Sequence, residues 1–161
     1  MAAGVLELLV RLRPEQKEVF ETRWKAWDED AKQRIAAWTK RLAPLRGKPI
    51  TTYHRSWSYF GERFGLVLAG EVEPKPGLAP TASHLIALKQ TLMDRSVRVL
   101  LIEPWYSERS LGQLLDGTQT RLVKSATTCG LTTETEHYLD FIEYLVNQIA
   151  LAHDLPPLTE S

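Results

Sequence analysis

The sequence predicts an α/β protein with a small four-stranded parallel sheet and helices on both faces, preceded by one long helix. Between residues 49 and 152, short β-branched or aliphatic segments alternate with amphipathic segments. This alternation is typical of repeated strand–helix units, which build a parallel sheet covered by helices. Before these units, residues 14–46 keep an unbroken helical periodicity, which indicates the long helix.

Composition limits the classes of function. The 161 residues are enough for one domain with a buried core. Twenty basic and twenty acidic side chains cancel, and no basic stripe is present, which argues against nucleic acid or an anionic membrane as a partner. The single cysteine, Cys129, has no partner within the chain for a disulfide or a Cys-x-x-Cys motif.

The first residues are apolar and predict a helix. Val5, Leu9 and Leu12 recur at helical spacing, and no N-cap residue precedes them. We therefore expect residues 1–13 to be the end of a helix from something longer. No basic region precedes the apolar run and Glu7 interrupts it, so we expect no export signal in this chain.

The long helix is predicted to open near Pro14 and to end near Ala43. Its apolar residues step by three and four along one stripe: Phe20, Trp24, Trp27, Ala31, Ile35, Trp38, Leu42 and Leu45. We interpret the stripe as the buried face of a helix packed along a sheet or a neighbouring lobe. A tryptophan binding platform and a two-helix coiled coil are the alternatives.

The first strand is predicted over residues 50–53, directly after Pro49, and His54 stands at its end. A short helix follows and closes at Gly65. In open α/β sheets the carboxyl ends of the strands border the ligand crevice, which favours a functional role for His54. The alternative is a helix-entry histidine that is hydrogen-bonded to a nearby carbonyl.

Two further strands follow. Residues 65–72 predict a second strand that is apolar on both faces, and residues 97–102 predict a third that ends at Glu103. Between them Thr81 is the expected N-cap of a helix, with His84 solvated in its first turn. Glu103 at the third strand end parallels His54, and its alternative interpretation is a carboxylate that accepts backbone N–H groups.

The last part of the chain predicts a weaker fourth strand over residues 120–124, followed by the loop Ser125–Cys129 on the same rim. The final helix opens at Thr133–Glu136, which has the spacing of a capping box. We expect residues 155–161 to form a disordered tail.

His54, Glu103 and Cys129 are the residues at this rim that can carry chemistry. Imidazole, carboxylate and thiolate are ligands of divalent metals, zinc among them. A catalytic triad of the same three residues is the competing hypothesis, but no sharp strand-to-helix turn surrounds Cys129. No Gly-x-Gly-x-x-Gly or Walker loop is present, so the sequence does not support a nucleotide site.

Three stretches, in order, resemble the zinc/manganese family of substrate-binding proteins that feed ABC importers. They are Ile-Thr-Thr-Tyr-His-Arg-Ser-Trp-Ser-Tyr-Phe at residues 50–60, Gly-Glu-Val-Glu-Pro-Lys-Pro-Gly at 70–77 and Leu-Ile-Glu-Pro-Trp-Tyr at 101–106. The resemblance covers residues 14–152. In that family a long rigid helix joins two α/β lobes, and the metal lies between them.

The resemblance implies a domain organisation. Residues 1–13 would be the end of an N-terminal-lobe helix, 14–46 the linking helix and 47–154 the C-terminal α/β metal-binding lobe. The rest of the N-terminal lobe, with its two histidine ligands, would be missing from this chain.

The resemblance also implies the metal ligands. The C-terminal lobe's histidine ligand falls on His54, and Glu103 would hold that imidazole or a water molecule in place. The family's other ligand of this lobe, an acidic residue, falls within Ser125–Cys129, where no carboxylate exists. Cys129, Glu134 or Glu136, or water, are the candidates to replace it.

The expected function is therefore non-enzymatic capture of a divalent metal, with zinc favoured because imidazole is the softer partner and manganese as the alternative. The expected partners are the permease of an ABC importer and the missing lobe, and the expected location is periplasmic or extracellular. The alternative is an interaction or scaffold module of the same fold that no longer binds metal. The tryptophan face of the long helix predicts self-association if it is exposed.

Overall fold

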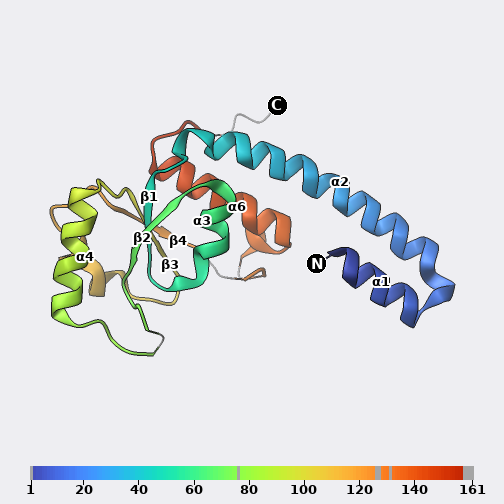
Figure 1. Ribbon diagram of the computed structural model, residues 1–161, viewed down its shortest axis with the longest axis horizontal. Helices are drawn as coiled ribbons and strands as arrows, with labels where there is room; N and C mark the ends of the chain where they lie inside the picture. The colour runs from blue at the N-terminus through green and yellow to red at the C-terminus, as the bar shows by residue number, and fades with distance from the viewer. Residues whose placement is uncertain (1, 76, 126–127, 131, 158–161) are drawn as a thin grey trace. The chain divides into compact units, whose positions relative to one another are not determined.

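The computed structural model describes residues 2–75, 77–125, 128–130 and 132–157. The chain divides into two compact units, residues 1–38 and 39–161. The first unit is helical: it contains α1 (Ala2–Leu12), the 3-10 turn η1 (Pro14–Gln16) and most of α2 (Lys17–Leu42) (Figure 1). None of the described helices combines the length and the apolar character needed to cross a lipid bilayer.

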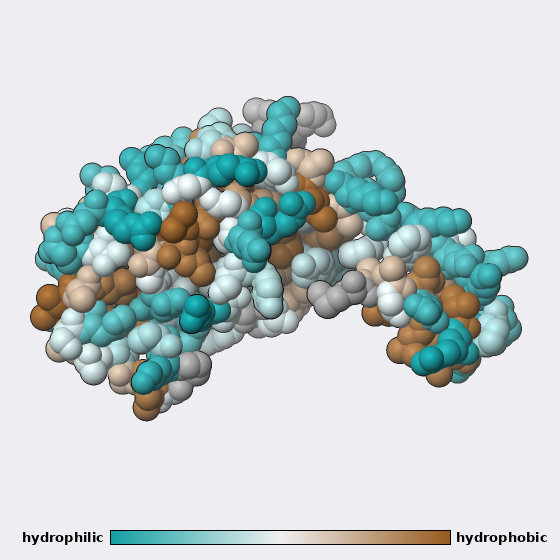
Figure 2. Space-filling view, in the orientation of Figure 1, coloured by the Kyte–Doolittle hydropathy of each residue, from teal (hydrophilic) through white to brown (hydrophobic). Residues whose placement is uncertain are grey.

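Within this helical hairpin, α1 and α2 border an open apolar hollow of about 430 Å³. The residues that line it are Ala2, Val5, Leu6, Leu9, Phe20, Arg23, Trp24 and Trp27. Hydrophobic side chains gather on the hairpin in Figure 2. The predicted buried stripe of α2 is therefore only partly correct: Ala31 and Trp38 are buried, but Trp27 is 41% exposed, because the short α1 leaves the beginning of the stripe partly uncovered.

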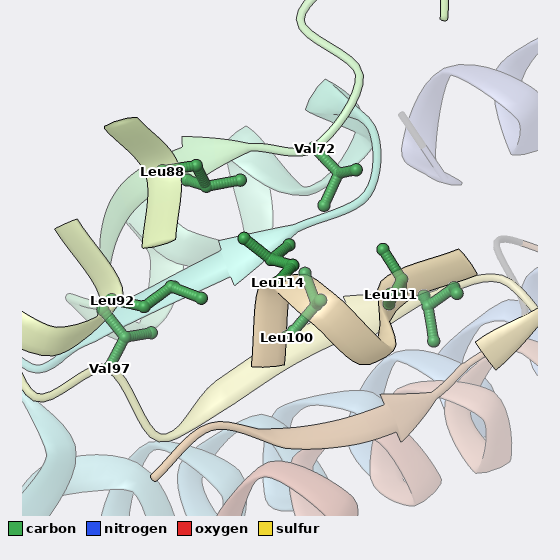
Figure 3. Close-up of a cluster of buried hydrophobic side chains, with 8 residues drawn as sticks. Val72, Leu88, Leu92, Val97, Leu100, Leu111 and Leu114 are labelled. Carbon is green, nitrogen blue, oxygen red and sulfur yellow. The ribbon is translucent and has the colours of Figure 1, made fainter. Parts of the chain in front are cut away.

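The second unit contains a four-stranded sheet with the order β2-β1-β3-β4. Its strands are β1 (Pro49–Thr52), β2 (Val67–Glu71), β3 (Val99–Ile102) and β4 (Arg121–Lys124), and every pairing is parallel. Helices lie on both faces, with α4 (Ala82–Asp94) and α5 (Gly112–Leu115) on one and α6 (Tyr138–Ala152) on the other (Figure 3). The predicted fold class is confirmed.

One irregularity interrupts the pairing of β1 with β2. Ile50 pairs with Leu68 but Thr51 pairs with Gly70, so Ala69 is an extra residue in β2. A Cβ atom at Gly70 would lie 2.8 Å from Cδ1 of Leu88, so the side-chain-free residue allows α4 to approach the strand.

The short connecting helices are α3 (Ser58–Phe64) and the 3-10 turns η2 (Ala43–Leu45), η3 (Arg55–Trp57), η4 (Glu108–Leu111) and η5 (Thr133–Thr135). Helix α3 ends at Gly65, as predicted, with a φ of 71° that glycine adopts without steric cost.

The core surrounds β3, whose four residues are all buried because helices cover both faces of this central strand. The cluster on the α4–α5 face consists of Val72, Leu88, Leu92, Val97, Leu100, Ile102, Leu111 and Leu114 (Figure 3). Strand β2, in contrast, is an edge strand with partly exposed residues, although α3 and α4 both contact it.

Of the predicted helix starts, the cap at Thr81 is confirmed, and the opening of the final helix at Thr133–Glu136 is wrong. The hydroxyl of Thr81 caps α4 by accepting a hydrogen bond from the backbone N–H of His84 at 3.2 Å. The capping box involves Thr132 and Thr135 and belongs to η5, whereas the final helix begins at Tyr138. The prediction of a solvated His84 is wrong, because its Nε2 donates to the carbonyl of Glu71 at 2.8 Å.

Candidate metal centre

The site lies where the winding of the sheet reverses. Strand β1 continues through α3 to β2 on one side, and β3 continues through α5 to β4 on the other. The carboxyl ends of β1 and β3 therefore flank the switch point, where open α/β sheets bind ligands. His54 follows β1 and Glu103 follows β3.

Backbone hydrogen bonds extend beyond the strand ends and fix the positions of these residues. The N–H of Tyr53 donates to the carbonyl of Leu101 at 2.7 Å, and the N–H of Glu73 donates to the carbonyl of Tyr53 at 2.9 Å. His54 follows directly in an extended conformation. Its Cα is thus held by the sheet, which leaves the orientation of the ring to its side-chain contacts.

The imidazole of His54 has a carboxylate beside each ring nitrogen. Nδ1 lies 3.3 Å from Oε1 of Glu103, and Nε2 lies 3.4 Å from Oε1 of Glu73. The side chain is 19% exposed. If Nδ1–H donates to Glu103, the lone pair is on Nε2, the arrangement in which a histidine binds a metal.

Glu103 is 2% exposed, which is unusual for a carboxylate. Its second oxygen, Oε2, has no hydrogen-bond partner among the described residues. Among the described residues, no backbone N–H group donates to Oε2, so the alternative interpretation of Glu103 as an acceptor of backbone N–H groups is not supported at this oxygen. Burying a negative charge is costly unless it is paired, so the site favours a positive charge next to Glu103.

Two tyrosines form an aromatic wall beside the histidine. The rings of Tyr53 and Tyr106 stack with centroids 4.2 Å apart, and the Tyr106 hydroxyl lies 3.4 Å from Nε2 of His54. Burial raises the pKa of Tyr53 above its usual value, and the nearby charge of Glu73 raises it further. Tyr53 therefore stays neutral and covers one side of the site with an apolar surface.

Glu73 is the site residue that the sequence analysis missed. Its side chain is 11% exposed, and Oε1 also accepts a hydrogen bond from the N–H of Gly77 at 2.6 Å. Glu73 was assigned to a loop because prolines follow it, and its position two residues after the end of β2 was not considered. The signal that would have found it is the parallel with His54 and Glu103 at the other strand ends.

The remaining candidates do not join this cluster. Cys129 is a free, half-buried thiol, and no contact between it and His54 or Glu103 is found among the described residues. Ala126 and Thr127 of the same loop lie outside the described residues. In the described part of the chain, no three His, Cys, Asp or Glu side chains form a group that could hold a metal ion.

Glu134 and Glu136 are both exposed. The pKa of Glu134 lies below its usual value because its carboxylate accepts a backbone hydrogen bond and one from the Thr132 side chain. This carboxylate thus has a local partner at the start of η5.

Comparison with known proteins gives a consistent result. Residues 1–152 match the family model of ZnuA, the periplasmic component A of a zinc-uptake complex. The high-affinity zinc uptake system protein ZnuA of Brucella abortus is 28% identical over 123 residues, covering 75% of this chain and 36% of that protein. ZnuA of Yersinia pestis is 23% identical over 151 residues, covering 91% and 46%. The chain thus spans less than half the length of these relatives.

Solved structures share the fold. A crystal structure of ZnuA has a TM-score of 0.78 at 19% identity, covering 93% of this chain and 54% of that one. The periplasmic zinc-binding protein TroA from Treponema pallidum has a TM-score of 0.73 at 18% identity, covering 93% and 58%. The laminin-binding protein Lbp of Streptococcus pyogenes has a TM-score of 0.72 at 19% identity, covering 96% and 60%.

Proposed function

This chain belongs to the ZnuA family of periplasmic zinc-uptake components, and we propose that it binds a divalent metal ion, zinc in the first place, through Nε2 of His54. The family is one of solute-binding proteins and not of enzymes, so the metal is cargo. The observation that carries the proposal is the contact of Nδ1 of His54 with the buried carboxylate of Glu103 at 3.3 Å.

The chemistry of this pair supports metal binding. A carboxylate that accepts the Nδ1–H of a histidine fixes the tautomer and the ring orientation, and it makes Nε2 a stronger ligand. A bound cation would also compensate the buried charge of Glu103, whose second oxygen has no partner among the described residues. Imidazole is a softer ligand than carboxylate, which favours zinc over manganese.

Zinc takes four ligands, and His54 supplies one of them. We propose that further ligands come from a second lobe outside these 161 residues. The chain covers only 36–46% of the ZnuA proteins from Brucella abortus and Yersinia pestis, which is consistent with that division. We also propose that the bound metal is released in the periplasm to the permease of an ABC importer.

The proposal is tested by zinc titration of the chain in competition with a chromophoric chelator. His54→Ala should weaken binding by at least the factor of about 10–100 that the loss of a supporting group causes. The matched control is His137→Ala, which removes an exposed imidazole at the start of α6. Equal zinc affinity of the wild type and His54→Ala would refute the role of His54.

One observation favours a second candidate function. The loop Ser125–Cys129, in which the resemblance places an acidic ligand, has no carboxylate. An interaction module of the same fold that has lost metal binding would show no zinc affinity in the wild type, and the same titration therefore separates the two functions.

A further inference from the structure

Glu73 offers a carboxylate at the ring nitrogen that the proposed function assigns to the metal. We propose that Glu73 is a metal ligand together with His54, and that it replaces the acidic ligand missing from Ser125–Cys129. This inference rests on the proposed function. It assigns different roles to two carboxylates that contact the same imidazole.

The distance between the two donor atoms fits a shared metal ion. Zinc binds histidine nitrogen and carboxylate oxygen at about 2.0–2.2 Å, so two ligand atoms at a tetrahedral angle lie about 3.4 Å apart. Nε2 of His54 and Oε1 of Glu73 are 3.4 Å apart. This separation is compatible with one zinc ion that both atoms bind.

Glu73 is also held in position. Its N–H donates to the carbonyl of Tyr53, the residue before His54, so the two proposed ligands lie on adjacent, hydrogen-bonded strand ends. Its Oε1 accepts from the N–H of Gly77 at 2.6 Å, which fixes the side chain. An ionised carboxylate has about four lone-pair positions, so this hydrogen bond leaves capacity for a cation.

The charge at the site supports the same conclusion. The carboxylates of Glu73 and Glu103 both lie within 3.4 Å of the same imidazole ring. Both side chains are nearly buried, so water screens them poorly. Oε2 of Glu103 has no partner among the described residues. A divalent cation at Nε2 balances these charges.

The competing explanation is structural. Glu73 would then only anchor the loop through Gly77 and accept a hydrogen bond from Nε2–H of His54. In that case the proton and the metal would compete for the same nitrogen, and removing the charge of Glu73 would leave zinc affinity unchanged or raise it.

The variant Glu73→Gln separates these explanations, because glutamine keeps an oxygen acceptor for the N–H of Gly77 but is a poor zinc ligand. The matched control is Glu71→Gln, which removes a nearby carboxylate that faces Arg55 at 3.9 Å. The probe is zinc alone, measured by chelator competition, with Co²⁺ absorption as a second readout of the ligand set.

We expect Glu73→Gln to lose at least about tenfold in zinc affinity, within the range of about 10–100-fold known for groups around a metal. We also expect it to weaken the visible bands of bound Co²⁺, while Glu71→Gln changes neither. Wild-type affinity in Glu73→Gln, with His54→Ala impaired, would overturn this inference and leave the proposed function intact. An absence of zinc binding in the wild type would overturn both.

A second variant covers a failure of Glu73→Gln to fold. Glu73→Asp keeps the negative charge but withdraws the oxygen by one methylene. A ligand role predicts reduced zinc affinity in this variant, whereas affinity equal to that of the wild type contradicts it.

Discussion

Replacing Glu103 by glutamine should change zinc affinity and folding stability in opposite directions. The substitution keeps the shape of the side chain but removes a negative charge that is 2% exposed and has one oxygen without a partner among the described residues. Leaving a buried polar group unsatisfied costs about 1–3 kcal/mol, and more when the group is charged. The glutamine amide leaves a neutral group unsatisfied in place of a charged one, so Glu103→Gln should raise the free energy of unfolding of the metal-free chain by about 1 kcal/mol.

The same change should weaken zinc binding by about 10–100-fold, which corresponds to about 1.4–2.7 kcal/mol, because Nδ1–H of His54 loses its anionic acceptor. Urea denaturation at pH 7 with a chelator present measures the stability, and chelator competition measures the affinity. A variant that is less stable than the wild type and binds zinc equally well would refute the argument, since Glu103 would then be a structural residue unrelated to His54 binding.

Three further predictions concern the rest of the chain. Leu100→Ala, in the fully buried central strand, should lower the free energy of unfolding by about 2–5 kcal/mol in urea denaturation, whereas Leu78→Ala at an exposed position should change it by less than about 0.5 kcal/mol. The pKa of His153 is lowered, first by burial and then by Arg98, so the folded state binds this proton less readily than the unfolded state, whose pKa is 6.5. The contribution of His153 to stability is therefore complete above pH 6.5 and is lost as the pH falls below it. The urea midpoint should drop between about pH 7 and pH 5, and His153→Gln should reduce that drop. Trp27 is 41% exposed beside the apolar hollow of the hairpin, so we expect the chain to self-associate as its concentration rises. Sedimentation velocity measures this, and Trp27→Glu should suppress it. Identical sedimentation of the wild type and Trp27→Glu would contradict the prediction.

Local signals in the sequence were sufficient for most of the fold. The four strands, the cap at Thr81 and the stop at Gly65 follow from residues close in the chain, and the structure has them within a few residues of the predicted bounds. The edge position of β2 was not predictable in this way, because an apolar run does not reveal how many neighbours a strand has. The partial exposure of the α2 stripe has a similar cause, since periodicity shows which face is apolar and not what covers it.

The candidate site was predicted in part. His54 and Glu103 were expected at the same rim, and the structure brings their side chains to 3.3 Å because β1 and β3 are adjacent central strands. Glu73 was missed because its approach to His54 depends on the pairing of β2 with β1, which is a contact between distant parts of the sequence. The role of each residue in metal binding remains a prediction.

The extra residue Ala69 in β2 has a consequence for any attempt to re-engineer this protein. Side chains alternate between the two sides of a strand, so inserting or deleting one residue exchanges the two sets beyond that point. Ala69 is the residue without a partner in β1, so deleting it would restore regular pairing while Gly70 and Glu71 stay opposite Thr51 and Thr52, and Glu73 would keep its place beside His54. A homologue without the extra residue would match this strand only if its alignment has a one-residue gap at Ala69, and an alignment without that gap would assign the wrong residue to the position of Glu73.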